Sequence, residues 1–141
     1  GLLRPQVAEQ LKTADAILHG GDINKQGIVD ELRQYAPLYV VRGNNDKDWA
    51  ASLPLDLRFS LGGLAFHMVH DKRDLPPDLA GVDVVVYGHS HRYAQEVRGG
   101  VLYLNPGSCG PRRFHQEITL AEMAIEDGAC RVEKIVLPHE P

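Results

Sequence analysis

Short apolar runs alternate with stretches of helical spacing in the first half of the chain. In residues 25–35 the apolar side chains Ile28, Val29 and Leu32 fall on one helical face, which predicts a helix packed on a sheet. Further helices are predicted over residues 5–13 and 47–52, and strands over residues 16–18 and 38–41. This alternation is typical of α/β proteins.

Consecutive strands replace this alternation in the second half of the chain. Residues 55–61 and 64–69 flank a Gly-Gly turn and predict a hairpin, and the continuous apolar run 82–87 predicts a strand that is buried on both faces. The connection 71–81 is predicted to be a loop with at most one helical turn. Antiparallel strands in a meander are predicted at residues 94–98, 101–104, 117–125 and 130–137. We therefore expect a single mixed α/β domain over residues 1–141.

Composition limits the class of protein. The chain has 141 residues, and 43% of them are hydrophobic, which is enough for a buried core. No apolar run reaches the roughly 18 to 20 residues of a membrane helix, so we expect a soluble, cytoplasmic protein without membrane association. Fifteen basic residues against 19 acidic ones give a net charge of −4, which disfavours strong nucleic-acid binding. The two cysteines have no metal-finger spacing, which indicates a reducing compartment.

Residues that can bind a metal follow four of the predicted strands. Because ligands bind beyond the carboxyl ends of strands in α/β sheets, we expect these side chains to converge on one site. One carboxylate, one amide and three imidazoles suit Mn, Fe, Co, Ni or Zn better than Mg or Ca. The candidate ligands are Asp22, Asn44, His70, His89 and His91.

The order of these residues resembles a known family. Gly21-Asp22, Gly43-Asn44, His70 and Gly88-His89-Ser90-His91 look like the motifs of the calcineurin-like metallophosphoesterase superfamily. Asn105-Pro106-Gly107-Ser108 resembles its small bacterial and archaeal phosphodiesterase branch, whose fold is shared by the retromer subunit Vps29. The resemblance implies an α/β fold, namely a four-layer α/β/β/α sandwich of two mixed sheets, with two divalent metal ions at the carboxyl ends of its central strands.

The resemblance also implies roles for individual residues. Asp22 would bridge the two ions. The coordination of the second ion would be completed by Asn44, His70 and His89, and His91 would be a ligand of the first ion. Asp22, Asn44, Asn45 and His89 are the catalytic candidates in this reading. The implied activity is hydrolysis of phosphodiester or phosphomonoester bonds in a small phosphate ester by a metal-activated water.

Two departures from the family pattern affect the prediction. Many members have His at the position of Asn45, where it is thought to protonate the leaving group, and Asn cannot do this near neutral pH. Family members also open with a strand that ends in Asp-X-His, and this sequence begins at the Gly that commonly follows. We therefore expect a chain truncated at its N-terminus, without the first strand and two ligands of the first metal. Its activity stays an open question.

Several alternatives stay open on the sequence. Asp22 and Asn44 after glycine could be ordinary turn residues, and His70 could be a surface residue. A rival function is a non-catalytic, Vps29-like protein-binding scaffold, and a third is metal binding without catalysis. His67 and His139 fit structural roles better than site roles. The natural substrate, the identity of the metal and the oligomeric state are not determined, and a homo-oligomer is compatible with the sequence.

Overall fold

The computed structural model describes residues 11–20, 26–43, 53–76, 79–90, 92–107 and 118–137. In the first unit, strand β1 (Ile17–His19) pairs in parallel with β2 (Leu38–Val40), and helix α2 (Gln26–Arg33) connects them. Val29 and Leu32 of α2 are buried, as the helical spacing predicted. The helix ends before the predicted residue 35, since Pro37 disfavours helical geometry in the residue before it.

The second unit is a mixed five-stranded sheet with the strand order β3-β4-β5-β7-β6. Its three inner strands are parallel to one another, and the two edge strands are antiparallel to their neighbours. The bounds are β3 (Asp56–Leu61), β4 (Leu64–Val69), β5 (Val84–Val86), β6 (Tyr93–Arg98) and β7 (Val101–Pro106). The short 3-10 helix η2 (Lys72–Asp74) lies in the connection between β4 and β5, which confirms the single helical turn expected there.

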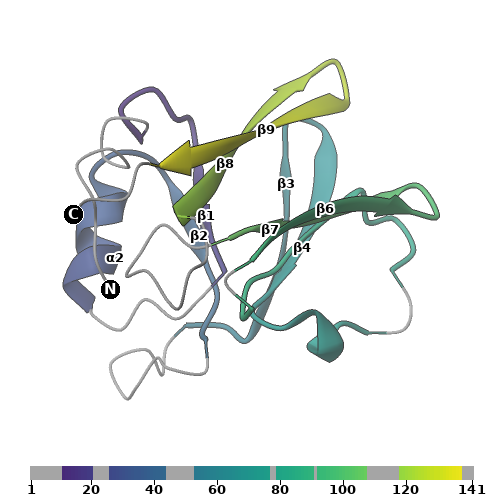
Figure 1. The fold of residues 1–141 in the computed structure, drawn as a ribbon, viewed down its shortest axis with the longest axis horizontal. Coiled ribbons are helices and arrows are strands. Elements are labelled where there is room, and N and C mark those ends of the chain that lie inside the picture. Colours follow the sequence, from purple (N-terminus) through teal and green to yellow (C-terminus); the bar gives the residue numbers. More distant parts are fainter. Residues whose placement is uncertain are drawn as a thin grey trace.

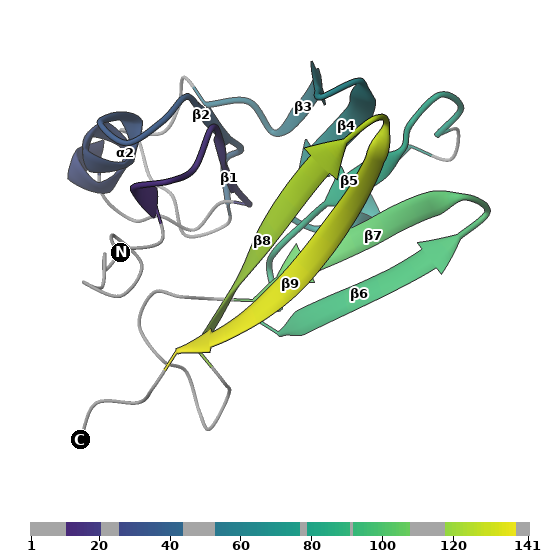
Figure 2. The same ribbon diagram turned by 90° about the horizontal axis from the view of Figure 1, so that it is seen from above.

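A long antiparallel ribbon completes the described strands. It consists of β8 (Ile118–Glu126) and β9 (Ala129–Leu137), which pair only with each other. The predicted meander is therefore correct for the pairs β6–β7 and β8–β9. The ribbon nevertheless forms a separate sheet that crosses over the larger one (Figures 1 and 2).

The main core lies between these sheets. One face of the five-stranded sheet contributes Phe66, Met68, Val84 and Val86, and side chains from β1, β2 and the β8–β9 ribbon pack against them. The opposite face carries Val85, covered in part by the β4–β5 connection. Strand β5 is thus buried on both faces, as its apolar run predicted. With α2 beyond the smaller sheet (Figure 2), the arrangement confirms the expected α/β sandwich, although the described part of the chain is rich in strands.

His67 lies in β4, next to the central strand of the larger sheet. It is fully buried in β4, and neither ring nitrogen has a hydrogen-bond partner among the described residues. Burial lowers the pKa of His67 below its usual value, although Asp56 Oδ2 lies 3.8 Å from Nε2. The neutral imidazole therefore packs as a core residue, in line with its expected structural role.

In the part of the chain described, no helix has the length and apolar character needed to cross a bilayer.

The β3–β4 turn provides a test of the packing between hairpin and ribbon. Gly62 and Gly63 both have positive φ, of 58° and 85°, but a Cβ atom on Gly62 would lie 2.5 Å from Ile125 Cγ2, whereas one on Gly63 would meet nothing within 4 Å. We expect Gly63→Ala to lower the free energy of unfolding by about 1 kcal/mol through backbone strain. Gly62→Ala should lose roughly 1–3 kcal/mol more through overpacking. Chemical denaturation of both variants measures this, and equal losses would contradict the described contact.

Candidate metal centre

Two of the candidate ligands lie at the carboxyl ends of neighbouring strands. His70 directly follows β4, and His89 follows β5, which is parallel to β4 and adjacent to it. This agrees with the expectation that strand ends bring the predicted ligands together. The other four candidate site residues lie outside the described residues: Asp22, Asn44, Asn45 and His91.

The two imidazoles face each other edge to face. His70 Nε2 and His89 Nδ1 are 3.4 Å apart, and the ring planes meet at 86° with their centroids 5.3 Å apart. His70 is 5% exposed, whereas the side chain of His89 is 39% exposed. The pair therefore has one buried side and one side that a ligand can approach from solvent.

A backbone carbonyl determines the tautomer of His70. Its Nδ1 lies 2.6 Å from the carbonyl oxygen of Gly20, which follows β1. Because a carbonyl can only accept a hydrogen bond, Nδ1 carries the proton and donates a hydrogen bond to the Gly20 carbonyl oxygen. In the neutral ring this places an acceptor lone pair on Nε2, the atom that faces His89. Metal-binding histidines usually have such a hydrogen bond on the nitrogen that does not bind the metal.

Asp71 lies near the ring nitrogen of His89 that faces away from His70, as the Gly20 carbonyl does at His70. Asp71 Oδ2 lies 3.7 Å from His89 Nε2. Arg73 binds Asp71 through its backbone N–H, Nε and Nη2, with Nη2 2.6 Å from Oδ2, and this hydrogen bonding lowers the pKa of Asp71 to about 2. The ionised carboxylate favours a proton on Nε2 and hence a lone pair on Nδ1, the atom that faces His70.

The distance between the two facing nitrogens fits a shared metal ion. Ligands at about 2.0–2.1 Å from a tetrahedral Zn²⁺ are about 3.3–3.4 Å from each other. The observed separation of 3.4 Å matches this value. Within the described ranges, no group of three or more His, Cys, Asp and Glu side chains is placed to hold a metal. The described part of the chain thus supplies two imidazoles, and the remaining predicted ligands stay predictions.

Two glycines allow the strand ends of the two sheets to meet. A Cβ on Gly20 would lie 3.3 Å from Gly88 N, and a Cβ on Gly88 would lie 3.4 Å from Gly20 O. Gly88 N also donates to the carbonyl oxygen of His70 at 2.8 Å. The backbone contact is therefore tight for a side chain at Gly20, whereas a Cβ on Gly88 would make ordinary van der Waals contacts.

Asn105 holds the turn that carries His89. It is 0% exposed, and its Nδ2 donates to the carbonyl oxygen of Gly88 at 3.1 Å and to Ser90 Oγ at 3.2 Å. Its Oδ1 accepts from Gly107 N at 2.9 Å. His89 has a backbone φ of 74°, which residues other than glycine rarely adopt. Such strained backbone conformations often occur at functional sites. Asn105 belongs to the Asn-Pro-Gly-Ser motif, but the sequence pattern predicted no role for it.

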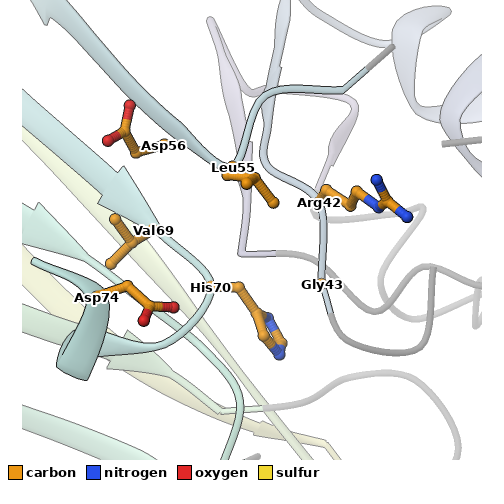
Figure 3. Close-up of a pocket in the computed structure, with 7 residues that line it drawn as sticks. All are labelled: Arg42, Gly43, Leu55, Asp56, Val69, His70 and Asp74. Atoms are coloured by element: carbon orange, nitrogen blue, oxygen red, sulfur yellow. The ribbon is translucent and has the colours of Figure 1, made fainter. Parts of the chain in front are cut away.

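A cavity adjoins the histidine pair. It has a volume of about 510 Å³ and lies between the ends of β2 and β4 and the start of β3 (Figure 3). His70 forms part of its wall, so the cavity adjoins one of the two described candidate ligands. The lining residues are Arg42, Gly43, Leu55, Asp56, Val69, His70 and Asp74.

Comparison with known families establishes the class of protein. Residues 1–128 match the family model of the calcineurin-like phosphoesterase superfamily domain, and the chain belongs to this superfamily. It is similar to a probable metallophosphoesterase from Methanothermobacter thermautotrophicus, with 31% identity over 113 residues. The alignment covers 72% of this chain and 64% of that relative.

Solved structures show the same fold. An archaeal phosphodiesterase is similar with a TM-score of 0.78 and 22% identity, covering 94% of this chain and 90% of the other. Vps29 from Entamoeba histolytica, solved in complex with Zn²⁺, is similar with a TM-score of 0.73 and 22% identity, covering 96% and 91%. These likenesses confirm the metallophosphoesterase and Vps29 type of sandwich that the motifs implied.

Asn105 provides a test of how the site is held. Asn105→Ala removes the donor to Gly88 and Ser90, and we expect Zn²⁺ affinity to fall about 10- to 100-fold, as for other residues that support metal ligands. Thr119→Val is the matched control. It removes a neighbouring buried hydrogen bond, from Thr119 Oγ1 to Pro106 O, without touching the His89 turn. It should cost about 1 kcal/mol of stability and leave metal affinity unchanged. Titration calorimetry measures the Zn²⁺ affinity of both variants. Equal affinities would contradict the role of Asn105.

Proposed function

We propose that this chain is a metal-dependent phosphoesterase that hydrolyses phosphodiesters with water as the nucleophile. Membership of the calcineurin-like phosphoesterase superfamily supports this proposal at the level of the reaction class. The observation that carries it is the His70–His89 pair, whose facing nitrogens are separated by the distance that a shared tetrahedral ion requires.

The proposed ligand set combines described and predicted residues. His70 and His89 would bind one ion with Asn44, Asp22 would bridge to a second ion, and His91 would bind that second ion. When bound, divalent ions polarise phosphoryl oxygens and lower the pKa of a coordinated water. Mn, Zn, Fe, Ni and Co all suit these donors.

The described residues around the pair orient it for this task. The Gly20 carbonyl keeps the proton of His70 on Nδ1, and Asp71 favours the proton of His89 on Nε2. The two nitrogens left to bind a metal are then the ones that lie 3.4 Å apart. Arg73 keeps Asp71 ionised down to low pH, because its hydrogen bonds hold the pKa of that carboxyl at about 2.

Asn45 limits the kind of leaving group that the proposed enzyme can expel quickly. An amide cannot protonate a departing alkoxide near neutral pH. We therefore expect esters of acidic alcohols, such as aryl diesters, to be cleaved much faster than simple alkyl diesters. A phosphodiester with an aryl leaving group is accordingly the substrate with which activity should be measured.

A scaffold function is the second candidate. The likeness to Vps29 supports it at the level of the fold. Metal binding cannot separate the two functions, since that Vps29 was itself solved with Zn²⁺. Hydrolysis separates them, because a scaffold needs no turnover.

The test combines metal content with turnover of bis(p-nitrophenyl) phosphate. We expect His70→Ala to remove most bound Mn²⁺ or Zn²⁺ and to lower kcat/KM at least 100-fold, because a metal ligand is lost. Asp22→Ala should behave in the same way. His139→Ala, a histidine outside all motifs, is the matched control and should keep both properties. Metal binding without turnover would support the scaffold, and equal behaviour of all three variants would contradict the assigned site.

A further inference from the structure

The cavity beside His70 combines apolar and acidic groups. Leu55 is 72% exposed and supplies apolar surface, whereas Val69 is buried in the wall with 1% of its surface exposed. Two carboxylates, Asp56 and Asp74, also line it. A volume of about 510 Å³ lies in the usual range for pockets that bind small molecules.

Among the described residues that line this cavity, two are acidic and one, Arg42, is basic. In η2 the two basic side chains are directed elsewhere: Lys72 Nζ lies 5.5 Å from the centre of the Tyr87 ring, and Arg73 is bound to Asp71. Figure 3 shows the Asp74 carboxylate extending toward His70, whereas the guanidinium of Arg42 extends away from both. Asp74 is therefore the charged side chain best placed to meet a group that enters next to His70.

We propose that this cavity binds one alcohol group of a phosphodiester and selects alcohols that carry a cationic group, such as amino alcohols. This inference rests on the proposed phosphodiesterase function. The phosphate would lie at the histidine pair, and the adjoining cavity would take the alcohol attached to it. Leu55 would contact the carbon atoms of that alcohol, and Asp74 would attract its positive charge. A second anionic group would be repelled from the same place.

The size of the preference follows from the exposure of Asp74. Its side chain is open to solvent, so its attraction for a cation is screened. Exposed ion pairs of this kind correspond to a preference of about two- to fivefold. A larger factor would need a more enclosed carboxylate.

The experiment compares two substrates that differ in charge and little in shape. They are p-nitrophenyl phosphorylcholine and p-nitrophenyl 3,3-dimethylbutyl phosphate, in which carbon replaces the quaternary nitrogen. We expect the full chain with bound metal to show a kcat/KM ratio of about two to five in favour of choline. Asp74→Asn should bring this ratio close to one by lowering kcat/KM for the choline ester.

Asp127→Asn is the matched control. It removes the same charge in the β8–β9 turn, and the neighbouring end of that ribbon packs against the β3–β4 turn, at the far end of the hairpin from the cavity. This variant should keep the wild-type ratio. If neither ester is cleaved by the wild-type chain, the proposed function fails and the inference fails with it. If both are cleaved at equal rates, or if Asp74→Asn keeps the ratio, the inference alone is overturned.

Discussion

The close contact between Gly20 and Gly88 is the constraint on which the candidate site depends. These residues lie beyond the ends of strands in two different sheets, and their backbones approach so closely that a Cβ on Gly20 would be 3.3 Å from Gly88 N. The contact brings the Gly20 carbonyl within 2.6 Å of His70 Nδ1. The Gly20 carbonyl at this contact thus determines which nitrogen of His70 is directed toward His89.

The same region contains strain that other interactions offset. His89 has a positive φ, which strains the backbone of a non-glycine residue. Buried Asn105, with three hydrogen bonds, and the bond from Gly88 N to the His70 carbonyl oxygen hold this arrangement. A divalent ion would bind to the two facing nitrogens of the histidine pair. Local strain at a functional site, supported by its surroundings, is a common pattern in proteins.

Most of the described fold could be predicted from the sequence, and less of the site could. The helix α2, the Gly-Gly hairpin and the doubly buried strand β5 follow from local periodicity, which the structure preserves. Periodicity could not show that the β8–β9 ribbon forms its own sheet, because strand pairing depends on distant contacts. For the same reason the proximity of His70 and His89 could be expected from strand ends, whereas Gly20 O, Asp71 and Asn105 as their supports could not. The assignments of Asp22, Asn44, Asn45 and His91 stay predictions.

We propose that His70 and His89 share one metal ion through Nε2 and Nδ1. Anomalous X-ray diffraction at the zinc edge, from crystals of the full chain grown with Zn²⁺, tests this most directly. We expect a peak about 2.0–2.1 Å from both His70 Nε2 and His89 Nδ1, with His70 Nδ1 still bonded to the Gly20 carbonyl. A peak that contacts the opposite nitrogens, or no zinc between the two rings, would contradict it.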